Sequence, residues 1–448
     1  MLRRYLRSFT GFERDARLFL LVTLLAGGAL SLYWIDFNLY LRSLGLSPAT
    51  IGIIATAANA AAMVAAFPAS YLSDRYGRRL MLVGAAGLAV VAFAGLLFAK
   101  PVALIALLAC LFSVAQSAVG VVTLPFLTEH SRPKERNELF ALQFAISNAT
   151  NVGAALVGGL VAQLVAGWAG HAADSPETYR VLIALMVGFS VAAFVVVLRL
   201  RDDRPGARPR VESNRVDPWP ALMESQPGRR LRSTLDALRL PIVHRGRFVR
   251  LLVPGFIISI GAGQVIPFLN LFVEQKFGLQ IASLNALFAI ASLGTLVAVL
   301  IQPALARRFG KVGSVVLVQG LSIPFLLVLG FSPVFWTVVV AMTVRNSLMN
   351  AGNPIASAFA MEHVDAVERA TFSAASSLLW SLGWVIGGVW FSLLQSALGF
   401  DGGFAVNFIT ITVLYTIATW LYWAWFRPVE RREMEAAREA ANGAGAGA

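Results

Sequence analysis

Apolar stretches of about 20 residues recur along the whole chain, and each is long enough to cross a lipid bilayer as a helix. Short polar segments separate them. Within hydrocarbon a spanning segment must satisfy its own backbone hydrogen bonds, which favours helices. Only 14% of the 448 residues are charged, compared with about 25% in an ordinary soluble domain. The sequence therefore predicts an all-α membrane protein with twelve transmembrane helices.

The first apolar segment is too long for the core of a signal peptide and no Ala-x-Ala cleavage site follows it, so we expect it to be retained. The predicted spans are 16–40, 49–72, 80–99, 102–128, 138–167, 179–198, 249–273, 281–305, 312–331, 334–360, 371–398 and 402–426.

A net charge of +13 would ordinarily suggest nucleic acid as a partner. The distribution of the charge argues against this. With an even number of helices and both termini cytoplasmic, all but five of the 37 Lys and Arg residues fall in cytoplasmic segments, as the positive-inside rule requires. The exceptions are Arg42, Lys100, Arg180, Lys276 and Arg345. We therefore expect a multi-pass protein of the bacterial inner membrane, in contact with the lipid bilayer and without nucleic acid.

Cysteine and histidine are too few and too scattered for a metal centre or an enzyme active site. Cys110 is the single cysteine, and it lies in an apolar span. The four histidines fall in loops or at helix ends, and none stands at a useful spacing from a nucleophile or another ligand. The sequence therefore predicts no enzymatic activity, no metal and no cofactor.

Shifting the chain by 233 residues aligns its two halves without a gap. Gly28 falls on Gly261, Arg75 on Arg308 and Gly77 on Gly310. The segment TEHSRPKER at 128–136 falls on MEHVDAVER at 361–369. Six helices per half make the repeats parallel, an architecture in which transporters bind substrate between the halves near the midplane. We expect two pseudo-symmetric six-helix bundles, at 1–198 and 247–426.

The two remaining segments carry weaker signals. A basic cytoplasmic linker at 199–246 joins the bundles, and its part at 229–240 fits either a helix on the anionic membrane surface or a solvated linker. The tail at 427–448 ends in Ala and Gly repeats, and we expect it to be disordered.

The loop between the second and third spans reads SYLSDRYGRR at 70–79. It resembles the G-x-x-x-D-[RK]-x-G-[RK]-[RK] signature of the major facilitator superfamily, with Ser70 in place of the first glycine. With the twelve helices and the half-repeat, the resemblance covers essentially the whole chain. The helix-four motif of proton-coupled members lacks its arginine near Gln116, and the helix-five pattern of drug antiporters is reduced to Ala154-Ala155-x-x-Gly158-Gly159. Both departures argue against a typical proton-coupled drug exporter without excluding it.

In that family this loop is a latch of the cytoplasmic gate, which implies such a role here for Asp74, Arg75, Gly77 and Arg78. Arg78 can reach Glu129 at the end of the fourth span, and the half-repeat predicts a matching pair of Lys311 and Glu362. The remaining candidate gate residues are Arg136, Arg308 and Arg369.

Several predicted spans carry polar residues on one face. Such residues line water or substrate, or they join helices through hydrogen bonds. In the family fold helices one, four, seven and ten line the central cavity, which makes these residues candidate ligands. The candidates are Gln116, Asn148, Asn151, Gln264, Asn346, Asn350, Trp380 and Trp384.

Two charged residues, Asp36 and Arg345, lie clearly within spans and away from the span ends. Arg345 lies roughly 17 Å below the outer end of its helix, near the midplane. It is expected to bind an anionic group of the substrate or to pair with Asp36. Asp36 is expected either to carry a proton or to cap a loop near Arg42.

Together these features predict a monomeric secondary transporter that moves a small organic solute by alternating access, with proton coupling as an option. The alternative is a receptor or assembly factor that kept the fold without transporting.

Overall fold

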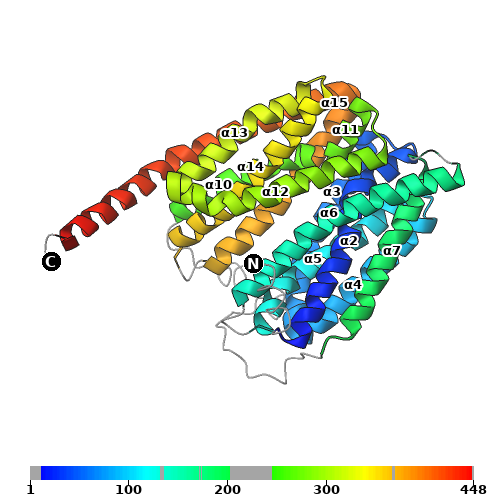
Figure 1. Ribbon diagram of the computed structural model, residues 1–448, viewed down its shortest axis with the longest axis horizontal. Coiled ribbons are helices and arrows are strands. Elements are labelled where there is room, and N and C mark those ends of the chain that lie inside the picture. Colours follow the sequence, from blue (N-terminus) through cyan, green and yellow to red (C-terminus); the bar gives the residue numbers. More distant parts are fainter. Residues whose placement is uncertain are drawn as a thin grey trace, which may run out of the picture.

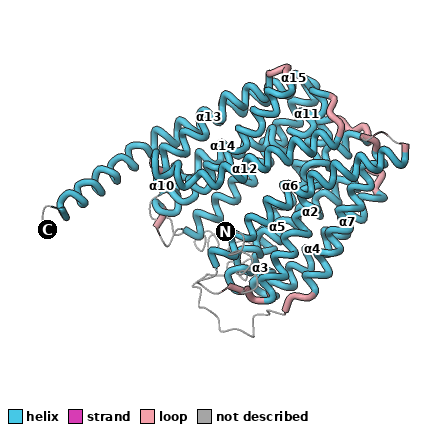
Figure 2. The backbone as a smooth tube through the Cα atoms, viewed as in Figure 1, coloured by secondary structure: helices cyan, strands magenta, loops and turns pink. Residues whose placement is uncertain are grey.

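A computed structural model describes residues 12–131, 136–170, 172, 174–201, 245–365 and 369–445. Within the helices it leaves out some side chains, among them those of Asp74 and Arg136. The described residues form helices joined by short loops and contain no strand, as the tube view makes plain (Figure 2). The all-α prediction is confirmed.

The first half of the chain forms one group of helices, drawn from blue to green in Figure 1. Two of its helices begin in the same way, with a serine N-cap followed by proline: Ser47 accepts from Thr50 N and Ser175 from Thr178 N, each at 3.3 Å. The helices are α2 (Arg14–Ser43), α3 (Pro48–Tyr76), α4 (Arg78–Phe98), α5 (Val102–Glu129), α6 (Arg136–Ala169) and α7 (Pro176–Leu198).

The second half forms the other group, from green to red. Its first span is interrupted at Pro267, where the short 3-10 helix η1 (Ile266–Phe268) separates two α-helical pieces, because proline lacks the N–H that an α-helix needs. The helices are α10 (Arg245–Val265), α11 (Leu269–Phe277), α12 (Ile281–Phe309), α13 (Lys311–Phe331), α14 (Phe335–His363) and α15 (Arg369–Gly445).

The number of spans agrees with the predicted twelve. Ten helical segments of the described chain are long and apolar enough to cross a membrane. One of them, Thr371–Arg432, contains two spans that meet at Gly399, a glycine with φ of 68°. The helix α14 is a further span of 29 residues, made more polar by Arg345 and its asparagines.

The half-repeat is present in the backbone. The turns after α2 and α11 contain Gly45 and Gly278, at φ of 81° and 61°. The turns between α3 and α4 and between α12 and α13 contain Gly77 and Gly310, at 98° and 75°. Left-handed φ values favour glycine, so the same residue recurs at the same bend in both halves.

The predicted disorder of the tail is wrong for most of its length, because α15 continues as a helix to Gly445 and projects beyond the bundle (Figure 1). Residues 430–441 are mainly Ala, Glu, Arg and Met, which favour helix strongly enough to outweigh the Ala and Gly repeats that follow. Most of the linker, including the proposed surface helix at 229–240, lies outside the described residues.

Candidate functional site

The two halves meet mainly where α3 packs on α15 and α6 packs on α12, and α2 also contacts α11 and α12. We call the membrane side that bears Gly77 and Gly310 the motif side, and the side that bears Arg42 and Glu274 the far side. The contacts between the halves that are described next all lie in the far-side portions of these helices.

A polar network joins α2 to the second half on the far side. Arg42 forms an ion pair with Glu274, and both side chains are partly shielded from solvent. One to two turns deeper, Asn270 Nδ2 donates to the Ile35 carbonyl oxygen at 2.6 Å, and Asn38 Nδ2 donates to the Pro267 carbonyl oxygen. None of these three contacts was predicted, because periodicity along the sequence does not show which helix of the other half α2 meets.

Small residues let the backbones of the two halves approach at the same level. A Cβ atom at Gly388 of α15 would lie 2.3 Å from Thr56 Oγ1 of α3. A Cβ at Gly159 of α6 would lie 3.1 Å from Ala282 Cα and 3.4 Å from the Ala282 carbonyl oxygen of α12. The halves are therefore in close contact on the far side.

Asp36 lies within this contact region. Its carboxyl group and the Asn285 amide of α12 face each other across Gly158: a Cβ there would lie 3.5 Å from Asp36 Oδ2 and 3.3 Å from Asn285 Nδ2. Both side chains are buried. Neither the Asp36 carboxyl oxygens nor the Asn285 amide atoms have a hydrogen-bond partner among the described residues. The loop-capping alternative for Asp36 is wrong, since Arg42 pairs with Glu274 instead.

Arg345 of α14 is 4% exposed. It donates from Nη2 to Tyr415 Oη at 2.9 Å and from Nη1 to Asn346 Oδ1 at 3.0 Å. The predicted pair of Arg345 with Asp36 is absent from the described structure. Arg345 turns toward the last span, α15, within its own half, whereas Asp36 packs against α6 and α12.

Helix α14 carries the polar stripe that its spacing predicted, and the stripe becomes more exposed toward the motif side. Asn346 is half-buried, whereas Asn350 and Asn353 are exposed. Asn350 Nδ2 donates to the Asn346 carbonyl oxygen at 2.9 Å. Asn350 therefore keeps its amide oxygen available on an exposed face.

Aromatic residues meet where α2 approaches α15. The Trp34 and Trp384 rings lie edge to face with centroids 5.8 Å apart, one from each half. Trp380, one turn from Trp384, is 40% exposed. Gln264 lies beside this region, because α10 packs backbone to backbone on α15 at Gly263 and Trp384. The Gln264 Oε1 and Trp384 Nε1 atoms are buried and have no hydrogen-bond partner among the described residues.

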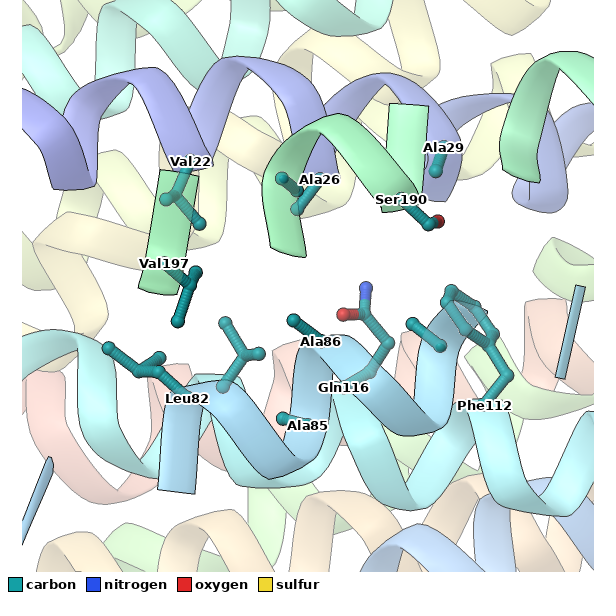
Figure 3. A pocket seen from close by; sticks show the side chains of 13 residues that line it. Val22, Ala26, Ala29, Leu82, Ala85, Ala86, Phe112, Gln116, Ser190 and Val197 are labelled. Atoms are coloured by element: carbon teal, nitrogen blue, oxygen red, sulfur yellow. The ribbon is translucent and has the colours of Figure 1, made fainter. Parts of the chain in front are cut away.

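Gln116 does not lie between the two halves, where a substrate ligand was expected. It lines a small, mainly apolar pocket inside the first bundle, together with Ala85, Phe112 and Ser190 (Figure 3). The helices around the pocket, α2, α4, α5 and α7, all belong to the first half. The prediction failed because a polar residue on one face of a span can point into its own bundle as well as toward the other half.

The two asparagines of α6 fit the hydrogen-bonding alternative. Asn151 shares a short hydrogen bond with Ser31 of α2, which joins two helices of one half. Asn148 donates to the Phe144 carbonyl oxygen of its own helix at 2.9 Å.

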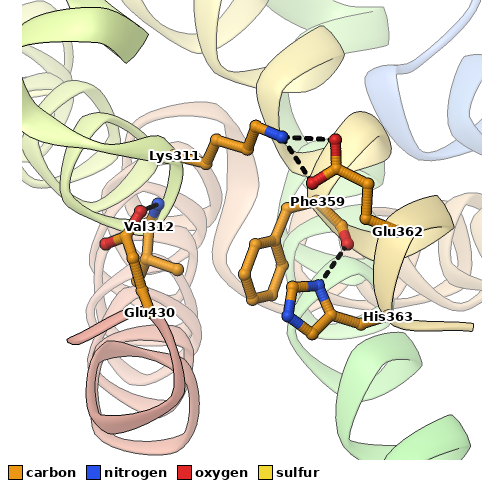
Figure 4. A network of polar contacts seen from close by, with 6 residues as sticks. All are labelled: Lys311, Val312, Phe359, Glu362, His363 and Glu430. Carbon is orange, nitrogen blue, oxygen red and sulfur yellow. Dashed lines mark hydrogen bonds and ion pairs between the residues drawn. The ribbon is translucent and has the colours of Figure 1, made fainter. Parts of the chain in front are cut away.

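The motif side repeats one set of contacts in both halves. Arg78 Nη2 lies 3.4 Å from Glu129 Oε1, and Lys311 forms an ion pair with Glu362. Figure 4 shows the second pair. The histidine that follows each glutamate donates from Nδ1 to a phenylalanine carbonyl oxygen, at 2.9 Å for His130 and 2.8 Å for His363. The predicted Glu–basic pairs are thus present.

The acidic residue of the latch comes from a different position in each half. Arg307 stands where the first half has Asp74, and in the second half Glu430 bonds the start of α13, accepting from Val312 N at 2.9 Å (Figure 4). A carboxylate at a helix N-terminus satisfies free N–H groups and the helix dipole. Glu430 is 6% exposed and was missed, because it lies in the segment predicted to be disordered.

The other gate candidates have local contacts. Arg75 donates to Tyr71 Oη at 2.9 Å, Arg308 lies over the Phe309 ring, and Arg369 donates to the Val364 carbonyl oxygen. The side chains of Asp74 and Arg136 lie outside the described residues.

Two six-helix bundles in contact along one membrane side define a polytopic transporter fold. The Major Facilitator Superfamily model matches residues 19–388 and, in a second match, 255–445. The chain belongs to the Major Facilitator Superfamily. No curated protein sequence matches it.

Solved structures share the fold at low sequence identity. A mutant of the nucleoside transporter NupG is 14% identical, with a TM-score of 0.72 over 92% of this chain and 100% of that one. A D-xylose–proton symporter is 14% identical, with a TM-score of 0.69 over 91% and 97%. A bacterial homologue of the human lysosomal transporter Spinster, in an inward-facing and occupied conformation, is 16% identical, with a TM-score of 0.67 over 92% and 96%.

Proposed function

We propose that this protein is a secondary transporter that moves a small organic solute across the bacterial inner membrane by alternating access. The observation that carries the proposal is the asymmetry of the interface between the halves. On the far side the halves are joined by the Arg42–Glu274 ion pair and by close helix contacts at Gly159 and Gly388. Toward the motif side, polar and aromatic residues such as Asn350 and Trp380 are exposed.

The positive-inside distribution supports a cytoplasmic motif side, with both termini cytoplasmic. In that orientation the structure corresponds to an inward-facing state. The Arg78–Glu129 and Lys311–Glu362 pairs are then candidate parts of a cytoplasmic gate that engages when the halves close on that side. A monomer suffices for this mechanism, because both halves belong to one chain.

Cysteine accessibility tests the proposal. In a Cys110→Ala background, Asn350→Cys is expected to react with a membrane-impermeant maleimide from the cytoplasmic side about tenfold faster than Val340→Cys. Val340 is an exposed apolar residue of the same helix, so it serves as the lipid-facing control. Equal slow reaction at both positions, without solute uptake in proteoliposomes, would instead support a receptor or assembly factor with this fold.

We further propose that Asp36 carries a proton. A buried carboxylate without a cationic partner is costly in a membrane protein, so a neutral carboxyl group fits the far-closed state. Opening the far side would separate Asp36 from Asn285, hydrate it and let it ionise. For the proton to cross, Asp36 would take it up from the far side before closure and release it toward the motif side afterwards.

Asp36→Asn is expected to keep solute exchange within about twofold of the wild type and to remove the dependence of net uptake on a pH gradient, since the amide mimics the neutral acid. Counterflow and pH-driven uptake in proteoliposomes measure the two properties separately. Unchanged pH dependence in this variant would show that Asp36 is not the proton carrier.

A further inference from the structure

Arg345 is a buried cation with no counter-ion among the described residues. It lies near the midplane of α14 and is 4% exposed, yet no carboxylate of the described chain forms an ion pair with it. The other deep charged residue, Asp36, lies against α6 and α12 and forms no ion pair with Arg345 in the described structure. A fixed charge at this depth is expensive and is commonly found where a protein handles ions or charged substrates.

The groups that do contact the guanidinium are neutral. Tyr415 Oη and the Asn346 amide oxygen each accept one hydrogen bond, and Arg345 Nε is buried without a partner in the described chain. An arginine presents several N–H donors in a planar fork that matches a carboxylate or phosphate group. Here Nη1 donates to a neutral amide, Nη2 donates to a neutral hydroxyl, and the Nε–H on the opposite edge from Nη1 is unused in the described chain.

The guanidinium connects to the exposed part of the stripe through its neighbours. Asn346, which accepts from Nη1, is half-buried, and its carbonyl oxygen accepts from the exposed Asn350. A rotation of the Asn346 side chain would free Nη1 without moving the backbone of α14. Tyr415 would stay on Nη2 and keep the fork oriented.

We infer that Arg345, positioned by Tyr415 and screened by Asn346, binds an oxyanion of the transported solute, so that the solute is an organic anion bearing a carboxylate or a phosphate. The inference rests on the proposed transport function and names its substrate class. The incoming oxyanion replaces the Asn346 amide oxygen on Nη1 and accepts a second hydrogen bond from the remaining N–H of Nη2 on the same edge, which converts a neutral contact into a charge-assisted, two-point one.

Matched pairs of acid and neutral compounds test the substrate class on the purified full-length protein. The pairs are benzoate and benzamide, gluconate and glucose, and uridine monophosphate and uridine, with inorganic phosphate as a further arm. At saturation an acid of at least one pair is expected to raise the Tm by about 3 °C, and its neutral partner by less than about 1 °C. A neutral member that stabilises as well as its acid, failure of every acid, or an equal effect of inorganic phosphate would each overturn the inference.

Variants separate a binding role from a structural one. Arg345→Met is expected to abolish the acid-induced shift and to raise the Tm of the ligand-free protein by about 2 °C, because it removes a buried charge that lacks a counter-ion. Arg345→Lys is expected to weaken the shift, since it keeps the charge but loses the fork. Tyr415→Phe keeps the cation but loses the hydrogen bond that positions it, so it is expected to weaken the shift less than Arg345→Met does.

If Arg345 serves only to hold α14 to α15, Arg345→Met and Tyr415→Phe would both lower the Tm of the ligand-free protein, and the acids would distinguish neither variant from wild type. That pattern would overturn the inference. Transport of a neutral solute by wild type and Arg345→Met alike would also overturn it while leaving the proposed transport function intact.

Discussion

Gly159→Leu is expected to hold the two halves apart on the far side and to reduce transport by at least about tenfold. The position leaves no room for a side chain, because a Cβ would meet the Ala282 backbone of α12 at 3.1 and 3.4 Å. Backbone atoms cannot rotate out of the way as a side chain would. Overpacking of this kind costs about 1–3 kcal/mol, which shifts a two-state equilibrium by about 5- to 150-fold.

Spin labels at Lys100 and Pro333, in the far-side loops of the two halves, measure this separation in a Cys110→Ala background. Gly159→Leu is expected to lengthen the distance between the labels. Gly153→Leu provides the control on the same helix, because nothing lies within 4 Å of a Cβ there. The control is expected to keep the wild-type distance and transport. An unchanged distance in Gly159→Leu would mean that α6 and α12 can slide without opening the far side.

The fold was predictable because its determinants are local and strong. Hydrophobic length defines the spans, Pro267 places the break between α10 and α11, and glycines at 45, 77, 278 and 310 place equivalent turns in both halves. The repeat also predicted the Lys311–Glu362 pair from its partner in the first half. These features depend on residues near each other in sequence or related by one constant offset.

The contacts between distant helices were not predictable in the same way. Asp36 could be paired on paper with Arg42 or with Arg345, yet the structure places it beside Asn285, a residue that the sequence did not single out. Arg345 donates a hydrogen bond to Tyr415, and the sequence does not distinguish Tyr415 from the many other aromatic residues of the last span. Periodicity shows which residues share a helix face, but it does not show which helix that face meets, as Gln116 illustrates.

The contact between α10 and the first span of α15 gives the largest expected effect on stability. A Cβ at Gly387 would lie 2.5 Å from the Ile260 carbonyl oxygen and 2.8 Å from Gln264 N, so any side chain must push the two helices apart. Gly387→Ala is therefore expected to lower the free energy of unfolding by about 2–3 kcal/mol, and Gly387→Val by more.

Thermal unfolding in detergent measures the effect, and Gly255→Ala is the matched control. Gly255 lies in α10 as well, but nothing stands within 4 Å of a Cβ there. Alanine exceeds glycine in helix propensity by about 1 kcal/mol, so this control is expected to be neutral or stabilising. The two substitutions are chemically identical and differ only in whether a neighbouring backbone fills the space. Equal Tm values for Gly387→Ala and Gly255→Ala would therefore show that α10 and α15 are not packed this closely in the membrane.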